Sequence, residues 1–175
     1  MNKVVILYST TDDHTVKISQ RIKSMLENSG HDVMLVAVSS AGSLELSEFD
    51  KIIIGASIRY GKHKEEVGDF VSKNREILET KITAFFTVNV VARKPNKNTP
   101  DTNPYLKKFL SKVSWKPDEL GVFAGKIDYQ KYGVLDRMMI RLIMFMTKGP
   151  TNPTAVVEFT DWETVEKFGR VVGEL

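Results

Sequence analysis

Five short apolar runs alternate with helical patterns along this chain, and the alternation limits the folds that it can adopt. The runs are rich in β-branched and aromatic residues, whereas the stretches between them repeat apolar residues at helical spacing. Strands that are apolar throughout are typical of a parallel sheet covered by helices on both faces. The predicted strands are Val4–Leu7, Val33–Val38, Ile52–Ala56, Ala84–Val88 and Leu120–Ala124.

The helical stretches carry recognisable end signals. Gly30 is expected to end the helix that follows the first strand, because glycine readily adopts the left-handed backbone of a helix C-terminus. Asn103 followed by Pro104 is typical of a helix start, and Thr160–Glu163 has the pattern of a capping box. The length of 175 residues suits one domain, so we predict a single α/β domain over residues 1–175.

The first candidate binding loop follows the first strand. Parallel α/β sheets bind ligands at the carboxyl ends of their strands, near the point where the strand order reverses. This loop is rich in hydroxyl groups and leads into a helix, whose free N–H groups and partial positive charge favour a phosphate. An ordinary helix cap is the alternative. The loop residues assigned to cofactor binding are Ser9, Thr10, Thr11, Asp12, Asp13, His14 and Thr15.

Two further loops follow the third and fourth predicted strands. A tyrosine and aliphatic side chains at such positions can sandwich a planar ring, and Asn89 can hydrogen-bond its polar edge. Tyr60 could equally be an ordinary half-buried aromatic residue, so the prediction depends on three loops that share one sheet edge. These loops contribute Ser57, Ile58, Arg59, Tyr60 and Gly61, and Asn89, Val90, Val91, Ala92 and Arg93.

Several kinds of chemistry are excluded by composition and motifs. The chain has no cysteine, and its three histidines are too widely spaced for a metal-ligand pattern, so no metal site is expected. No phosphate-loop, dinucleotide-binding or nucleophile-elbow motif occurs. Gly55–Ser57 stand where a receiver domain would need its phosphorylated aspartate. The N-terminus lacks the features of a signal peptide, and no apolar run is long enough to span a membrane.

The formal net charge of +3 and the pI of about 9.0 fit an acidic small molecule, an anionic membrane surface or nucleic acid. Nucleic acid is not expected, because no motif supports it. Residues 126–148 alone carry five basic and two acidic side chains. This segment belongs to a predicted basic insertion at about residues 126–155, between the fifth strand and the last helix.

The insertion contains a predicted helix from Val134 to Met146 that is dense in large apolar residues. At 1.5 Å per residue this helix is too short for the ~30 Å apolar core of a bilayer. It could lie in a membrane interface or contact a large apolar ligand. Covering the sheet or forming a homo-oligomer contact are the alternatives.

Segments along nearly the whole chain resemble the flavodoxin-like protoporphyrinogen IX dehydrogenases that pass electrons to quinone. They are IGASIRYG (54–61), VNVVARKP (88–95), TPDTNPY (99–105), DRMMIRLIMFM (136–146) and TDW (160–162). The resemblance implies a flavodoxin-like, doubly wound, five-stranded parallel sheet of order 2-1-3-4-5 with bound FMN. It also implies oxidation of protoporphyrinogen IX to protoporphyrin IX in heme biosynthesis, with menaquinone or ubiquinone as acceptor, and peripheral attachment to the cytoplasmic face of the inner membrane.

The first loop departs from this family's usual Ser-Thr-x-Asp-Gly-x-Thr, because Asp13 replaces the glycine. Aspartate tolerates left-handed backbone better than most residues, so the loop is expected to keep its shape. The carboxylates of Asp12 and Asp13 are expected to point outward or to cap neighbouring amides.

Nearby cations suit the propionates of a porphyrinogen, and no general acid or base is assigned because the flavin would do the chemistry. A flavodoxin-type electron carrier and an NAD(P)H-dependent quinone reductase are the alternative functions. The residues assigned to substrate or membrane contact are Lys94, Lys97, Arg137, Met138, Arg141 and Phe145.

Overall fold

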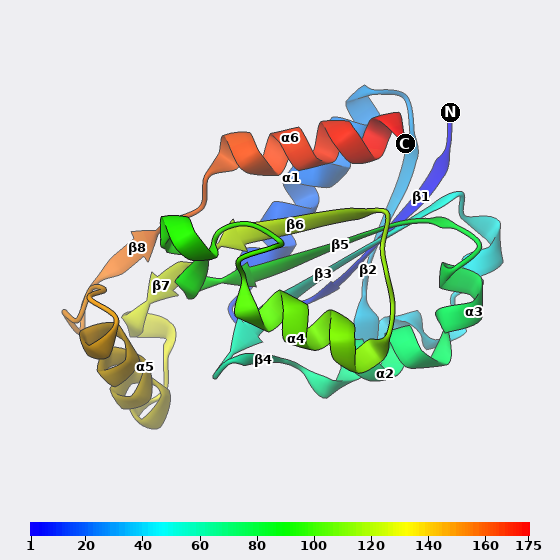
Figure 1. Cartoon of the computed structure of the whole chain (residues 1–175). Coiled ribbons are helices and arrows are strands. Elements are labelled where there is room, and N and C mark those ends of the chain that lie inside the picture. The colour runs from blue at the N-terminus through cyan, green and yellow to red at the C-terminus, as the bar shows by residue number, and fades with distance from the viewer.

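The computed structural model describes all 175 residues, which form a central parallel sheet between two helical layers (Figure 1). The strand order is β2-β1-β3-β5-β6, and each neighbouring pair is parallel. The predicted fourth and fifth strands are β5 and β6, so the predicted order is confirmed. The strands are β1 (Lys3–Ser9), β2 (Asp32–Ala37), β3 (Lys51–Arg59), β5 (Ile82–Asn89) and β6 (Glu119–Ala124).

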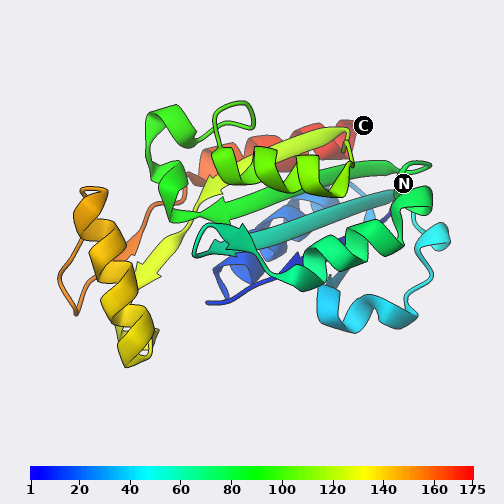
Figure 2. The ribbon, with the colours of Figure 1, turned by 60° about the horizontal axis from the view of Figure 1, so that its bottom comes forward.

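Helices cover both faces of the sheet, as Figures 1 and 2 show. One face packs against α1 (His14–Asn28) and α6 (Trp162–Glu174), whose buried residues include Ile22 and Phe168. The other face packs against α2 (Glu65–Lys73), α3 (Arg75–Leu78) and α4 (Pro104–Val113). Strands buried on both sides explain the continuous apolar runs in the sequence. The connection from β2 to β3 contains only the short 3-10 helices η1 (Val38–Ser43) and η2 (Leu46–Glu48).

Two of the three predicted helix ends have the expected residues. Gly30 follows the end of α1 with φ +86°, and the Asn103 side chain accepts the Leu106 N–H at the start of α4. The predicted capping box before α6 placed the cap one residue too early, at Thr160. Asp161 is the cap and accepts the N–H groups of the next turn, because the hydroxyl of Thr160 instead donates to the Ala124 carbonyl.

The insertion stands at the carboxyl end of the sheet (Figures 1 and 2). It contains β7 (Lys126–Asp128), the 3-10 helix η5 (Tyr129–Lys131), α5 (Val134–Met146) and β8 (Val156–Glu158). The strands β7 and β8 pair antiparallel outside the main sheet. Ile127, Tyr129, Tyr132 and Met144 form a small core of its own. None of the helices combines the length and apolar character needed to cross a bilayer.

The carboxyl ends of the strands carry two further short elements. The strand β4 (Lys62–His63) turns back antiparallel against the end of β3, and the tight turn between them contains Tyr60 at φ 52° and Gly61 at φ 77°. The 3-10 helices η3 (Val90–Arg93) and η4 (Pro95–Lys97) follow β5. Because β1, β3 and β5 are neighbours in the sheet, their three loops lie together at one edge.

Candidate functional site

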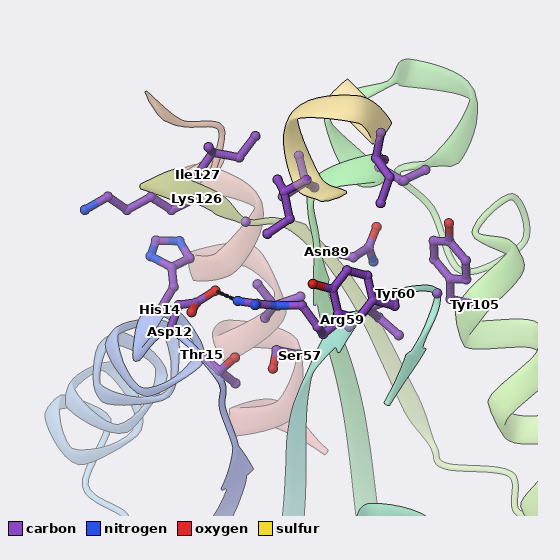
Figure 3. A pocket seen from close by; sticks show the side chains of 18 of the residues that line it. Asp12, His14, Thr15, Ser57, Arg59, Tyr60, Asn89, Tyr105, Lys126 and Ile127 are labelled. Atoms are coloured by element: carbon purple, nitrogen blue, oxygen red, sulfur yellow. Dashed lines mark hydrogen bonds and ion pairs between the residues drawn. The ribbon is translucent and has the colours of Figure 1, made fainter. Parts of the chain in front are cut away.

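A cavity of about 500 Å³ opens at this edge, between the loops after β1, β3 and β5 on one side and α5 on the other (Figure 3). Its volume falls within the range typical of cofactor and small-molecule sites. Twelve of the residues predicted from the three loops line it. They are Thr10, Asp12, His14, Thr15, Ser57, Ile58, Arg59, Tyr60, Gly61, Asn89, Val90 and Val91.

Five predicted residues lie outside the cavity lining. The Ser9 hydroxyl donates to the Glu66 carboxylate on α2 at 2.6 Å, and Ala92 is buried in the core. Thr11 and Asp13 are exposed. Arg93 lines a separate open groove with Lys94 and Lys148. The predicted loops therefore meet as expected, but each loop directs only some of its side chains toward the cavity.

Two buried hydroxyl groups, one directly after β1 and one in the first turn of α1, lack hydrogen-bond partners within the protein. They belong to Thr10 and Thr15, both in the cavity lining. Asp13 is the residue before α1 and has φ 61°, so it adopts the left-handed backbone expected at the glycine position. Its side chain caps no amide. The free hydroxyls and the first N–H groups of α1 together form a suitable cradle for a phosphate.

Asp12 points into the cavity rather than outward, so the prediction for its carboxylate was wrong. It pairs with the guanidinium of Arg59 from the loop after β3. Figure 3 shows this pair across the cavity. Burial alone would lower the pKa of Arg59, but the hydrogen bond and the charge of Asp12 outweigh it and raise the pKa. The bound cation therefore offsets the acid that would otherwise repel a phosphate.

Arg59 also connects the loop to the insertion. Its guanidinium donates to the Asp136 carboxylate of α5 at 3.2 Å and lies 5.1 Å from the ring centre of Tyr132. The Tyr60 hydroxyl donates to the same carboxylate. One arginine in the loop after β3 therefore contacts two other segments that are far apart in the chain, the loop after β1 and the insertion.

Asn89 supplies a third unpartnered buried group. Its Oδ1 accepts the Ala92 N–H at 2.9 Å, whereas its Nδ2 has no acceptor in the protein. Val90 and Val91 follow it along the cavity wall, and Tyr60 lies in the loop opposite (Figure 3 labels Asn89 and Tyr60). A free amide donor beside aliphatic and aromatic surfaces suits a planar ring with a polar edge.

His14 holds the first turn of α1 against the chain segment before α6. Because the Thr160 hydroxyl has one proton and donates it to Ala124, the His14 Nε2 must donate to Thr160 Oγ1, at 2.6 Å. Burial lowers the pKa of His14 and favours this neutral form. His14 therefore fixes the first turn of α1, whose N–H groups form part of the phosphate cradle.

The insertion contributes a wall of the cavity, with α5 residues that the sequence analysis did not assign to the site. Met139, Ile140, Ile143 and Met144 on one side of α5 face the cavity. Helical spacing could have grouped them, but α5 is apolar around much of its circumference, so periodicity did not show which side turns inward. The other unpredicted lining residues are Val88, Tyr105, Gly125, Lys126, Ile127 and Tyr132.

None of the six residues predicted for substrate or membrane contact lines this cavity. Met138 and Phe145 lie on the opposite, exposed side of α5. Arg137 donates to the carbonyls of Tyr129 and Tyr132, and Arg141 donates to that of Thr151. Both arginines therefore stabilise loops of the insertion. Lys94 lines the open groove, and Lys97 lies in neither place.

The fold and the phosphate cradle define a class of protein. Residues 5–154 match the family model of the flavodoxin domain, and the chain belongs to that family. In solved structures the fold is shared by flavodoxin 2 of Bacillus cereus, with a TM-score of 0.58, 19% identity and coverage of 98% of both chains. A flavodoxin from Fusobacterium nucleatum, solved bound to flavin mononucleotide, has a TM-score of 0.50 and 20% identity, covering 71% of this chain and 72% of that one.

Curated relatives narrow the assignment within this class. A protein of Escherichia coli strain K12 named protoporphyrinogen IX dehydrogenase [quinone] is 40% identical over 173 residues, 99% of this chain and 96% of the relative. A protein of Leishmania major with the same name is 39% identical over 167 residues, 95% of this chain and 72% of the relative. The chain therefore belongs to the family of the quinone-dependent protoporphyrinogen IX dehydrogenases and is a flavin-type oxidoreductase.

Proposed function

We propose that this chain oxidises protoporphyrinogen IX to protoporphyrin IX with bound FMN and passes the electrons to menaquinone or ubiquinone, in porphyrin and heme biosynthesis. The observation that carries the proposal is the set of three unpartnered buried groups, on Thr10, Thr15 and Asn89, around a cavity closed by an apolar helix. Buried polar groups without partners are rare in folded proteins, so a group of three in one cavity points to a polar ligand.

The residues present fit FMN. Thr10, Thr15 and the N–H groups at the start of α1 would hold the phosphate, with Arg59 offsetting the charge of Asp12. Tyr60 and Val90 would flank the rings, and the Asn89 amide would donate to their polar edge. When bound, the flavin accepts electrons in pairs from the porphyrinogen and delivers them to the quinone. The six-electron oxidation would take three such cycles. The porphyrinogen and the quinone would use the same open face of the cavity in turn.

The inner side of α5 gives the porphyrinogen and the quinone an apolar surface to bind. Met139, Ile140 and Ile143 give the cavity an apolar wall opposite the ring-binding loops. Such a wall excludes water and offers dispersion contacts to a macrocycle or a quinone ring, and methionine adapts to both shapes. A soluble electron carrier needs no wall of this kind.

We also propose peripheral attachment to the cytoplasmic face of the inner membrane, and the exposed outer side of α5 supports contact with lipid. Leu135, Met138, Leu142 and Phe145 repeat at helical spacing, and their exposed fractions are 73%, 63%, 54% and 75%. An exposed apolar stripe of this size is unusual on a monomer in water. Lys94 and Lys148, which have no acidic partners, line the open groove near the end of the helix and would face anionic lipid.

The two lysines that follow β5, Lys94 and Lys97, remain proposals for the propionates of the substrate. Lys94 and Lys97 are free to move toward a bound porphyrinogen, because neither side chain donates a hydrogen bond within the protein. Arg59 and Arg93 are already engaged with protein acceptors, so we do not assign the propionates to them.

The test is a steady-state assay of porphyrin fluorescence under anaerobic conditions. Protein reconstituted with FMN should form protoporphyrin only when both porphyrinogen and quinone are present, and protein without FMN should form none. Porphyrin formation that does not require the quinone, or rapid flavin reduction by NADPH alone, would contradict the proposal. The second result would favour a quinone reductase fed by NAD(P)H.

A further inference from the structure

The insertion helix α5 is weakly attached to the rest of the chain by packing. Among its thirteen residues only Met144 is buried, and that residue belongs to the small core of the insertion itself. All polar bonds between α5, with its terminal Thr147, and the body of the protein (residues 1–125 and 159–175) come from three side chains. These are Arg59, Tyr60 and Arg93.

The N-terminal end of α5 is held by the loop after β3. Asp136, in the first turn, accepts from the Arg59 guanidinium at 3.2 Å and from the Tyr60 hydroxyl. Arg59 itself is fixed from the other side by Asp12 and covered by Tyr132. The contacts with Asp12 and Tyr132 therefore hold the Arg59 side chain in the orientation in which it binds Asp136.

The C-terminal end of α5 is held by the loop after β5. Arg93 Nη2 donates to the carbonyl of Thr147 at 2.9 Å and to its hydroxyl at 3.0 Å. Arg93 Nη1 donates to the Val90 carbonyl at 3.0 Å, next to the cavity. A cation at a helix C-terminus also interacts favourably with the helix dipole.

We propose that Arg59 and Arg93 are positioning residues, which clamp α5 by both ends across the cavity and so hold its apolar wall at a fixed distance from the two ring-binding loops. The part of this inference that concerns the quinone rests on the proposed function. A loosened clamp lowers the fraction of protein with the wall in place, and the apparent affinity for a partner that needs the wall falls by the same fraction. The phosphate cradle lies on α1 and does not depend on the clamp.

The test uses the full chain loaded with FMN and five variants: two single changes in the clamp, their double variant, a conservative change at Asp136 and a matched control. Asp136→Asn removes the negative charge at the N-terminal end of α5, and Arg93→Gln removes the guanidinium that binds Thr147 at the C-terminal end. Asp69→Asn, on the exposed side of α2, makes the same charge change at a residue with no hydrogen bond or ion pair from its side chain, so it is the matched control. Hydrogen–deuterium exchange reports opening of α5, flavin fluorescence reports FMN affinity, and steady-state kinetics separate KM from kcat.

Each single variant should speed exchange of the α5 amides about five-fold, with α4 unchanged. The ends of a thirteen-residue helix are roughly 20 Å apart, so the two changes should act independently. Exchange in the double variant should therefore be faster by about the product of the two single effects, roughly twenty-five-fold. The dissociation constant of FMN should stay within two-fold of wild type. The KM for quinone should rise only as far as the open state of α5 becomes populated, so the factors by which exchange and KM rise multiply to no more than about five in a single variant and twenty-five in the double variant. The kcat should change less than two-fold, and Asp136→Glu should keep exchange and KM near their wild-type values.

Two results would overturn the clamp. Unchanged exchange of α5 in the double variant would mean that packing alone positions the helix. A rise of ten-fold or more in the FMN dissociation constant without faster exchange would place these residues in the cofactor site instead. If exchange and FMN binding behave as expected but the wild type forms no porphyrin, the clamp stands and the proposed function fails.

Discussion

Replacing Thr15 by valine tests the phosphate cradle because it should move two measured quantities in opposite directions. The residue is 1% exposed, and its hydroxyl has no partner within the protein. Valine has nearly the same shape, so the substitution removes the hydroxyl and leaves the packing in place. The protein without FMN should become more stable, and its affinity for FMN should fall.

The magnitudes follow from the burial of the hydroxyl. A buried polar group without a partner costs about 1–3 kcal/mol, so the apoprotein should gain roughly 1 kcal/mol in its free energy of unfolding. A hydrogen bond to a charged group contributes about 1.5–3 kcal/mol, so the dissociation constant of FMN should rise by roughly 10- to 150-fold. Thr10 should behave in the same way.

Urea denaturation of the apoprotein and titration of flavin fluorescence measure the two effects. Thr87→Val is the matched control, because Thr87 is equally buried but its hydroxyl is bonded to His63 at 3.0 Å. That variant should destabilise the apoprotein by about 1 kcal/mol and leave FMN affinity within two-fold of wild type. Loss of stability together with unchanged FMN affinity in Thr15→Val would refute the assignment of the cradle.

Three other predictions concern the core, the pH response and the exposed side of α5. Gly55→Ala should destabilise the protein by roughly 3 kcal/mol in urea denaturation, because its Cβ would lie 2.0 Å from the buried ring of Phe86; a change below 0.5 kcal/mol would contradict this. Burial lowers the pKa of His63 to about 4, below the ~6.5 of an unfolded chain, so the folded state binds fewer protons. Stability should be complete above pH 6.5 and fall by up to about 3 kcal/mol as pH drops to 4, with a smaller fall in His63→Phe. Phe145→Ser should weaken sedimentation with anionic vesicles several-fold without changing FMN affinity; equal sedimentation would argue against membrane contact through this side.

The sheet and the location of the site could be predicted because both follow from short-range patterns. Runs such as Ile52–Ala56 are apolar throughout because β3 is buried on both faces, and such runs mark strands directly in the sequence. Once the strands are parallel, their carboxyl ends share one edge, so Thr15 and Asn89 come together without further information. The short strands β4, β7 and β8 have two or three residues each, too few to show a period.

The direction of side chains within the site depended on contacts between distant segments. Asp12 turns inward because Arg59, 47 residues later, provides a cation, and Arg59 in turn reaches Asp136, 77 residues further on. No local pattern encodes these contacts. The same holds for α5, where the position of the helix over the cavity, and not its periodicity, decides that Met139 faces inward and Phe145 outward.

The most direct test of the account is anaerobic mixing of the FMN-loaded protein with protoporphyrinogen IX, followed by addition of quinone. The visible absorption of the flavin should disappear on the first addition and return on the second, with three such cycles for each protoporphyrin formed. A flavin that keeps its absorption in the presence of excess porphyrinogen, while still binding tightly to the protein, would contradict the central claim.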